Sequence, residues 1–375
     1  MAHKKKFFYS IGIMNGTSVD GIDISLIQSD GKNFIKPIFN KTYNYTKIFK
    51  NNIKNFLDQF NLEKVPELYN SKEFKIIDKK FSVFTSRKVI SFLRDFDFSI
   101  KKVDLIGFHG QTIYHNAKRK ISIQLGSGSK ISEKLNLPVV SDFRTDDLLN
   151  GGQGAPLVPI FHQKIFSKTR QNLSIVNIGG ISNLTLLIGK EKVFSTDIGP
   201  GNRLIDDFCC KYFNREFDKN GELSSDGNFK TKLVDRWLRY KIFKRKLPRS
   251  YDSTDFKLKD FVKEENYKKI DILSSLVFLS SKLIVNSNDF FGVKPGKIIL
   301  CGGGARNKTL IKYLKNLCDK KIITSDKLGW SSDYIESQAF GYLAIRKLLN
   351  LHSTFPETTG VSTPTICGKI YNHCV

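Results

Sequence analysis

The sequence predicts an α/β protein with two lobes. Short apolar runs typical of strands alternate along the chain with segments of helical periodicity. Glycine-rich turns flanked by polar residues follow strand-like runs in both halves of the chain. At 375 residues the chain is long enough for two hydrophobic cores. We expect residues 1–138 and 340–375 to form the first lobe and residues 139–339 to form the second.

Composition is ordinary for a globular protein, with 40% hydrophobic and 26% charged residues. No apolar run approaches the ~20 residues of a membrane span. The basic N-terminus leads into a short apolar run with no small-residue cleavage site, so we expect no signal peptide and a cytoplasmic protein. The six cysteines form no CxxC pair and no zinc spacing, which predicts reduced thiols.

The formal net charge of +25 would suit a nucleic-acid binder. However, the basic residues are spread along the chain, and the densest cluster, residues 240–249, lacks a nucleic-acid-binding module. We therefore expect neither a nucleic-acid nor a membrane partner. A basic nucleic-acid binder remains the alternative that a salt-dependent gel shift would reveal.

The chain is predicted to open with a β-hairpin formed by residues 7–14 and 22–26. The sequence between them, NGTSVDG, contains an Asp-Gly pair, which is a strong hairpin signal. Such a tip can hold phosphate and magnesium, although the same residues are also plain turn formers. It offers a flexible backbone, hydroxyls and carboxylates at Gly16, Thr17, Ser18, Asp20 and Asp23.

A buried strand over residues 103–108 ends in His109 and Gln111. Open α/β sheets bind ligands at the carboxyl ends of their strands, so both residues are candidates for binding a polar substrate. A structural histidine is the alternative interpretation of His109. The preceding pattern predicts a strand at 36–45 and helices at 46–60 and 71–96.

The stretch from 141 to 159, SDFRTDDLLNGGQGAPLVP, is the strongest candidate for a catalytic site. A strand over residues 138–143 delivers Asp142, Asp146 and Asp147 to a turn, Gly151-Gly152-Gln153-Gly154. Carboxylates beside a turn that exposes its backbone can bind a polar substrate and remove a proton. A solvated loop in which Asp and Gly only form turns is the alternative. A strand at 121–125 and a helix at 129–135 precede this stretch.

The second half repeats the pattern of strand and glycine turn. Strands at 173–177 and 184–188 flank Gly179, Gly180 and Asn183, which predicts a second hairpin. A strand at 193–196 runs into DIGPGN and a helix begins near residue 203, an arrangement that binds anions. Asp197 is well placed there to hold a metal ion, whereas an ordinary βα turn is the alternative.

A third glycine turn, Gly302-Gly303-Gly304, follows a strand at 297–301 and would allow flat contact with a base or ribose. It lacks GxGxxG spacing, so a dinucleotide-binding fold is disfavoured. Residues 214–266 are charged and loop-rich. The remaining pattern predicts a short helix at 160–166, helices at 229–243, 267–291, 308–317 and 331–349, a strand at 322–325 and an irregular tail.

A hairpin tip, a DxG turn and a GGG turn, divided between two halves of a chain, are typical of the actin and sugar-kinase superfamily of ATPases. Those proteins have two α/β lobes around a central cleft. Signatures of P-loop proteins and protein kinases are absent.

Seven stretches together resemble the anhydro-N-acetylmuramic acid kinase family over residues 11–370. In order, they are IGIMNGTSVDGID, GFHGQTIYH, SDFRTDDLLNGGQGAPLVP, NIGGISNLT, STDIGPGN, LCGGGARN and YIESQAFGYLAIR. The resemblance implies an actin-like kinase of peptidoglycan recycling that uses ATP, magnesium and water. Such enzymes open the 1,6-anhydro bond of the sugar and phosphorylate O6, giving N-acetylmuramic acid 6-phosphate and ADP. A homodimer is expected.

The resemblance also implies roles for individual residues. Asp147 would be the catalytic base. Asp20 and Asp197 are expected to be the metal ligands because of their positions beside glycine turns. Asn15 and Ile198 depart from the residues common in the family, and PRSYDSTDF at 248–256 matches it loosely. Substrate would contact His109, Gln111, Gly152, Gln153 and Glu336. ATP would contact Gly16, Thr17, Ser18, Val19, Asp20, Gly21, Ile22, Asp23, Gly179, Gly180, Asn183, Asp197, Gly199, Gly201, Asn202, Gly302, Gly303 and Gly304.

The implied chemistry is physically coherent, since one carboxylate can activate the water while the γ-phosphoryl group captures the leaving O6. Two alternatives use the same fold. In a hydroxyl-directed sugar kinase, Asp147 would deprotonate the sugar rather than water. In an actin-like filament protein, ATP would act only as a switch. Glu336 can also be a helix-capping residue together with Asp333.

Overall fold

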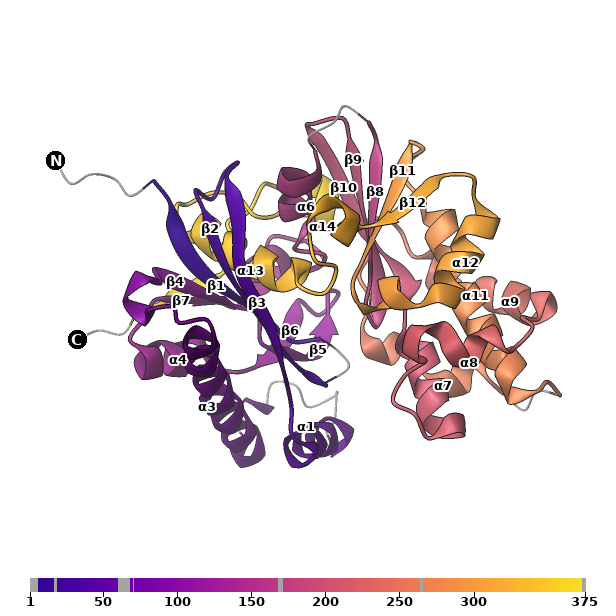
Figure 1. Cartoon of the computed structure of the whole chain (residues 1–375), viewed down its shortest axis with the longest axis horizontal. Helices are drawn as coiled ribbons and strands as arrows, with labels where there is room; N and C mark the ends of the chain where they lie inside the picture. The colour runs from indigo at the N-terminus through magenta and orange to yellow at the C-terminus, as the bar shows by residue number, and fades with distance from the viewer. Residues whose placement is uncertain are drawn as a thin grey trace. The chain divides into compact units, whose positions relative to one another are not determined.

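The computed structural model describes residues 6–16, 19–59, 68–69, 71–167, 171–263 and 266–372. Thr17 and Ser18, which we expect to bind ATP, lie outside these ranges. The chain divides into two compact units, coloured from indigo to yellow along the chain in Figure 1. The first unit comprises Met1–Ile165, Glu336–Pro356 and Gly360–Val375, and the second comprises Phe166–Ile335 and Glu357–Thr359.

The first unit is built on a six-stranded sheet in the order β13-β7-β4-β1-β2-β3. Strands β1, β2 and β3 form an antiparallel meander, whereas β1, β4 and β7 are parallel and β13 runs antiparallel to β7. The strands are β1 (Phe8–Met14), β2 (Gly21–Ser29), β3 (Ile35–Asn44), β4 (Leu105–Phe108), β7 (Val139–Ser141) and β13 (Lys369–Tyr371).

Because β7 pairs with β4 and β13, the segment 139–165 belongs to the first unit. The sequence-based boundary, between residues 138 and 139, placed this segment in the second lobe. A three-residue strand gives little signal of which sheet it joins. The chain returns to the first unit at Glu336, close to the expected return at residue 340.

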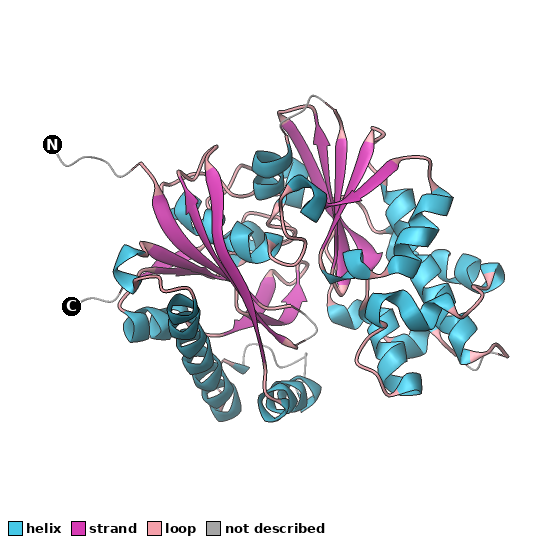
Figure 2. Ribbon diagram, in the orientation of Figure 1, coloured by secondary structure: helices cyan, strands magenta, loops and turns pink. Residues whose placement is uncertain are grey.

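Helices cover both faces of this sheet (Figure 2). Ile11 and Ile13 of β1 are fully buried in a core with Phe81 and Phe92 of α3. Since side chains alternate along a strand, Gly12 faces the opposite side. The helices of this unit are α1 (Lys47–Gln59), α3 (Lys72–Asp95), α4 (Gly128–Leu135), α5 (Thr145–Leu149), α6 (Pro159–Phe166) and α13 (Ile335–Leu348). The last residue of α6, Phe166, and the first residue of α13, Ile335, belong to the second unit.

Helix α13 lies directly on the backbone of two neighbouring strands. Gly12 of β1 and Gly107 of β4 are register partners. A Cβ atom on Gly12 would lie 1.8 Å from the Ser337 carbonyl oxygen, and one on Gly107 would lie 2.0 Å from that of Phe340. Only glycine allows so close a contact. The two glycines therefore fix where α13 crosses the sheet, and with it the position of Glu336.

The second unit contains a five-stranded sheet in the order β10-β9-β8-β11-β12. Its helices gather beside this sheet (Figure 2). The strands are β8 (Leu173–Ile178), β9 (Ile181–Ile188), β10 (Lys192–Pro200), β11 (Lys297–Cys301) and β12 (Lys321–Thr324). The helices are α7 (Arg203–Phe213), α8 (Glu222–Ser225), α9 (Thr231–Leu238), α10 (Leu258–Phe261), α11 (Lys269–Ser287) and α12 (Lys308–Leu317), with α14 (Pro356–Thr359) at the unit boundary.

The two sheets share one topology. In each, an antiparallel meander of three strands is extended by two strands parallel to its first strand: β3-β2-β1-β4-β7 in the first unit and β10-β9-β8-β11-β12 in the second. A duplicated α/β unit of this kind is the architecture expected of the actin-like class. The α/β fold class predicted from the sequence is confirmed.

By length and composition alone, helix α11 is long and apolar enough to cross a membrane. The expectation that no apolar run approaches this length therefore needs correcting. Its apolar residues, such as Ile272, Leu276 and Leu279, are buried in the core of the second unit. A core helix buried to this extent is weak support for a membrane span.

Two predicted elements differ clearly from the structure, and one strand was not predicted. The strand expected at 138–143 ends at Ser141, because Asp142 takes a left-handed conformation with φ of 58°. The segment 111–116 forms strand β5 (Gln111–Asn116), which pairs with β6 (Ile121–Leu125) in a separate two-stranded sheet. The helix expected at 229–243 is shorter, since α9 ends at Leu238 and a 3-10 turn follows.

Candidate active site

The residues predicted to act on the sugar in the first unit lie around one edge of its sheet. Because β1, β4 and β7 are parallel, their carboxyl ends share this edge. The phosphate hairpin follows β1, His109 follows β4, and the acidic stretch follows β7. The amino end of α13 points the same way, since Arg346 near its carboxyl end donates to the Gly31 carbonyl in the β2–β3 turn at the opposite edge. Its Phe340 ring lies 4.6 Å from the ring of His109.

Asp147 is fully buried in the short helix α5, below the Gly151–Gly154 turn. Its Oδ1 accepts a hydrogen bond from the Gly154 amide at 2.6 Å, and its carbonyl accepts one from the Gly152 amide at 2.8 Å. A Cβ atom on Gly152 would lie 2.2 Å from Oδ1, so this carboxylate needs a glycine there. Gln153 is half-buried in the same turn. The candidate base and the turn are thus one structural unit.

The three acidic residues of this stretch point to different partners. Asp146 Oδ2 accepts a hydrogen bond from the Gly368 amide at 2.9 Å. Asp142 Oδ1 accepts one from the Thr145 hydroxyl at 2.5 Å, and burial raises the pKa of the Asp142 carboxyl. Asp147 alone reaches the glycine turn through the contacts described above.

His109 holds Arg144 in place. The His109 Nδ1 donates to the Gly110 carbonyl at 2.8 Å, and Nε2 accepts from Arg144 Nε and Nη2 at 3.1 and 3.0 Å. Burial, reinforced by the adjacent guanidinium, lowers the pKa of His109 well below its usual value. Both ring nitrogens are therefore engaged inside the protein, which favours a positioning role for this histidine. Its contact with substrate stays a prediction.

The two ends of the phosphate hairpin are held from neighbouring strands. The Tyr45 amide donates to the Asp20 carbonyl at 2.9 Å, and the Tyr45 hydroxyl accepts from Asn15 Nδ2 at 2.8 Å. Gln111 Nε2 donates to the Gly16 carbonyl at 2.9 Å. The buried oxygens Asn15 Oδ1 and Gln111 Oε1 have no hydrogen-bond partner among the described residues. Both could accept a hydrogen bond from a bound ligand or water.

The hairpin residues expected to bind ATP differ in what they expose. Val19 is buried at φ of 54°, a conformation that is unfavourable for a β-branched residue and often found at functional sites. Ile22 is fully buried and Gly21 packs against the Tyr43 carbonyl, so these two could offer ATP only backbone groups. Asp20 is exposed, whereas Asp23 accepts a hydrogen bond from the Thr42 hydroxyl at 2.5 Å.

In the second unit, three glycine turns meet at one edge of the sheet. The amides of Gly201 and Arg203 donate to the Gly180 carbonyl at 2.9 and 3.1 Å, and the Asn202 amide donates to the Gly179 carbonyl at 2.8 Å. A Cβ atom on Gly304 would lie 2.2 Å from Ile178 and 3.0 Å from Asn202 Oδ1. The turns predicted to bind ATP therefore form one surface, with the amino end of α7 behind it.

A row of polar side chains crosses the sheet just below these turns. Asn177, Asn183 and Asp197 are cross-strand partners on β8, β9 and β10, so they share one face. Gly302, with φ of 78°, packs against Asn177, and Gly199 packs against Leu283 and Phe243. Asp197 is only 5% exposed, and its Oδ2 accepts a hydrogen bond from the Tyr251 amide at 2.8 Å.

The two predicted metal ligands are carboxylates, which is the type of ligand that magnesium prefers. Across the part of the chain that the structure describes, no cluster of three His, Cys, Asp or Glu residues forms a metal site. Magnesium is commonly held by one or two carboxylates together with phosphate oxygens and water, so it needs no such cluster. Asp20 is exposed and Asp197 is a hard oxygen donor beside the glycine turns. The two belong to different units, and their joint role stays a prediction.

Sequence reasoning missed the residues that hold the site together. Arg144 lies between the acidic residues of the motif and was given no role. Tyr45 and Arg249 lie far along the chain from the groups they bind, and no local pattern marks them. Glu336, which was predicted, lies half-buried in the first turn of α13. The Asp333 carboxylate forms an ion pair with Arg306. This ion pair competes with the helix cap that Asp333 was expected to form together with Glu336.

The chain matches the family model of anhydro-N-acetylmuramic acid kinase over residues 8–373. An anhydro-N-acetylmuramic acid kinase of Pelagibacter ubique is 37% identical, with 98% of this chain and 99% of that protein covered. One of Rhizobium johnstonii is 34% identical, covering 96% and 98%. A solved activator of 2-hydroxyisocaproyl-CoA dehydratase from Clostridium difficile with bound ADPNP has a TM-score of 0.46 at 12% identity, covering 92% and 96%.

The repeated α/β topology and the glycine turns at the sheet edges are the architecture expected of the actin-like, sugar-kinase class. Within that class the match extends over nearly the whole chain and nearly the whole of its relatives. The chain belongs to the anhydro-N-acetylmuramic acid kinase family. The family resemblance stated from the seven sequence motifs is confirmed.

Proposed function

We propose that this enzyme uses ATP and water to convert 1,6-anhydro-N-acetylmuramic acid into N-acetylmuramic acid 6-phosphate and ADP, in the recycling of peptidoglycan. Membership of the family supports the substrate and the class of reaction. The observation that carries the proposed mechanism is the buried Asp147 carboxylate, held against the glycine turn at the carboxyl edge of the first sheet.

In the proposed reaction, Asp147 takes a proton from a water molecule whose oxygen bonds to the anomeric carbon. The bond between that carbon and O6 breaks, and its electron pair stays on O6. O6 forms a bond to the γ-phosphorus as the bond to the ADP oxygen breaks. One base suffices, because the leaving oxygen is captured by phosphorus rather than protonated.

The surroundings of Asp147 suit this role. Its Oδ1 already accepts the Gly154 amide, which fixes the direction of the carboxylate. The side chain is fully buried, so the proposed role requires that the sugar and its water gain access to the carboxylate as they bind. Gln153, Gln111 and Glu336 are the polar side chains proposed to contact that sugar.

ATP is proposed to bind with its phosphates at the hairpin of residues 16–23 and at the turns containing Gly180, Gly201 and Gly303. Asp20 and Asp197 would hold magnesium, which neutralises phosphate charge when bound. Each of these groups offers backbone amides or a carboxylate, as phosphate and magnesium require. We further propose a cytoplasmic homodimer.

The decisive experiment incubates the enzyme with ATP, magnesium and the anhydro-sugar in ¹⁸O-labelled water and analyses the product immediately by mass spectrometry. The expected product gains one phosphoryl group and one water, with the label at the anomeric carbon. A product that gains only a phosphoryl group would instead identify a hydroxyl-directed kinase. No turnover, together with ATP-dependent pelleting in sedimentation, would identify a filament protein.

A further inference from the structure

Strand β10 contains an irregularity at the residue proposed to bind metal. Its register with β9 shifts between Asp197 and Gly199, which leaves Ile198 as an extra residue. A β-bulge of this kind bends the strand, redirects side chains and leaves main-chain groups outside the ladder. The direction of the Asp197 carboxylate therefore depends on whatever stabilises this bulge.

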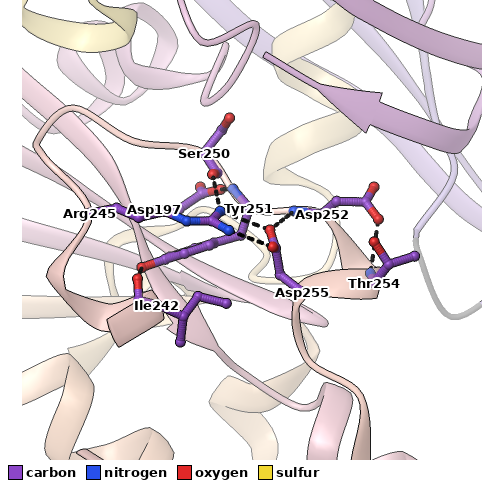
Figure 3. Close-up of polar contacts among 8 residues, drawn as sticks. All are labelled: Asp197, Ile242, Arg245, Ser250, Tyr251, Asp252, Thr254 and Asp255. Carbon is purple, nitrogen blue, oxygen red and sulfur yellow. Dashed lines mark hydrogen bonds and ion pairs between the residues drawn. The ribbon is translucent and has the colours of Figure 1, made fainter. Parts of the chain in front are cut away.

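The segment 249–251 pairs with the bulge. The Asp197 amide donates to the Arg249 carbonyl at 3.0 Å, and the Arg249 amide donates to the Thr196 hydroxyl at 3.0 Å. The Tyr251 amide donates to Asp197 Oδ2 at 2.8 Å. Figure 3 shows Tyr251 and Asp197 side by side. The segment thus binds both the backbone and the carboxylate of Asp197.

The Arg249 side chain completes this contact. Arg249 is only 5% exposed. Nε donates to the Asp197 carbonyl at 3.2 Å and Nη2 to the Ile198 carbonyl at 3.2 Å. Nη1 donates to the carbonyls of Phe243 and Arg245 at 2.7 and 3.1 Å. The planar Arg249 guanidinium therefore joins the bulge to the loop that contains Arg249. The single ammonium group of a lysine cannot reach these four carbonyls at once.

A second set of contacts holds this loop rigid (Figure 3). Arg245 Nη1 and Nη2 donate to Asp255 Oδ2 and Oδ1 at 2.9 and 2.6 Å. The Tyr251 hydroxyl donates to the Ile242 carbonyl at 2.9 Å, and the Tyr251 ring lies 5.1 Å from the Arg245 guanidinium carbon. Both arginines of the densest basic cluster thus make hydrogen bonds within the protein, and Arg249 is also buried, whereas Arg245 remains exposed.

We propose that Arg249 is a positioning residue that sets the direction of the Asp197 carboxylate toward the bound metal and phosphates. It acts through the bulge, by fixing the Asp197 and Ile198 carbonyls, and does not itself touch the nucleotide. This inference rests on the proposed role of Asp197 and adds the element that makes this carboxylate an effective ligand.

The test compares Arg249→Lys with the wild-type enzyme in two measurements. In the metal-free, nucleotide-free protein, amide hydrogen exchange of the peptide 193–203 is expected to become faster, because the bulge loses its clamp. In the activity assay, the magnesium concentration that gives the half-maximal rate is expected to rise about tenfold. This is the lower end of the loss in metal affinity that follows when a residue supporting a metal ligand is replaced. Unchanged exchange or an unchanged magnesium requirement overturns the proposal.

Arg346→Lys is the matched control, since Arg346 is also buried and donates to the carbonyls of Gly31 and His352. It is expected to cost stability without altering the magnesium requirement. If Arg249→Lys does not fold, Asp255→Asn decides the question. Its ion pair with Arg245 is partly exposed, and loosening the loop should accelerate exchange of the same peptide. Unchanged exchange in Asp255→Asn would then overturn the proposal.

Asp197→Asn separates the two levels of inference. If this variant leaves the magnesium requirement unchanged, the proposed metal role of Asp197 is wrong. If it raises the requirement while Arg249→Lys does not, Asp197 keeps its role and only the positioning role of Arg249 fails.

Discussion

Arg144 and Asp147 hold the same residue by its two backbone groups. Arg144 Nη1 donates to the Gly154 carbonyl at 2.9 Å, while Asp147 Oδ1 accepts from the Gly154 amide at 2.6 Å. His109 fixes the other side of the guanidinium. The candidate base is therefore oriented by a continuous set of hydrogen bonds from the end of β4 to the glycine turn.

The first prediction concerns the base itself. Asp147→Asn should retain the fold, because an amide oxygen can still accept the Gly154 amide. It should lower kcat by roughly 10²–10⁴-fold, since the amide cannot take the proton from water. Melting temperature and turnover should be measured on the same sample.

Asp146→Asn is the matched control, because the neighbouring carboxylate binds the Gly368 amide instead. Its turnover should stay near that of the wild type. Equal losses in both variants, or near-normal turnover in Asp147→Asn, would mean that Asp147 only stabilises the turn.

The second prediction concerns Arg144. Arg144→Gln should loosen the Gly154 carbonyl and the His109 ring while leaving the Asp147 carboxylate present. We expect kcat/KM for the sugar to fall about tenfold or more, as is usual when a partner that orients a functional group is lost. ATP binding, measured by calorimetry, should change little. A selective loss of ATP binding would place Arg144 in a different role.

The third prediction concerns the phosphate hairpin. Tyr45→Phe removes the hydroxyl that binds Asn15 but keeps the amide that binds Asp20. Losing one such hydrogen bond costs about 1 kcal/mol, so KM for ATP should rise roughly fivefold with little change in kcat. Tyr43→Phe is the control, since that hydroxyl binds exposed Asp95 at 2.5 Å. Equal effects in both variants would rule out a specific link to ATP.

The fourth prediction separates two neighbouring glycines of the third turn. A Cβ atom on Gly304 would lie 2.2 Å from the Ile178 side chain, so Gly304→Ala should destabilise the protein by about 1–3 kcal/mol. A Cβ atom on Gly303 would meet nothing within 4 Å. Gly303→Ala should therefore keep the melting temperature and weaken ATP binding severalfold. Unaltered ATP binding in this variant would remove Gly303 from the nucleotide site.

The fifth prediction concerns pH. Burial lowers the pKa of His162 to about 3, whereas an unfolded histidine titrates near pH 6.5. Below pH 6.5 the unfolded state binds more protons, so the free energy of unfolding should fall by up to about 1.4 kcal/mol per pH unit for this residue. Between pH 7.5 and 4.5 the melting temperature of His162→Gln should therefore fall less steeply than that of the wild type. Parallel slopes would show that this histidine does not titrate on unfolding.

Local patterns predicted the sheets and the glycine turns well, because apolar alternation and glycine act within a few residues. The short helix α5 was missed, since a single left-handed residue, Asp142, redirects the chain there. The residues that hold the site were missed for a different reason. Arg249 lies 52 residues from Asp197, and Tyr45 lies 30 residues from Asn15. Such contacts follow from the folded backbone and leave no periodic signal in the sequence.

The two glycines beneath α13 have a consequence for how the protein is made. Gly12 and Gly107 leave the ribosome early, but the helix that covers them begins only at Ile335. At about 5–20 residues per second, the interval between Gly12 and that helix is roughly 15–65 s. During this time the backbones of Gly12 and Gly107 lack the helix that covers them in the folded protein. The first unit therefore cannot be completed until almost the whole second unit has been translated.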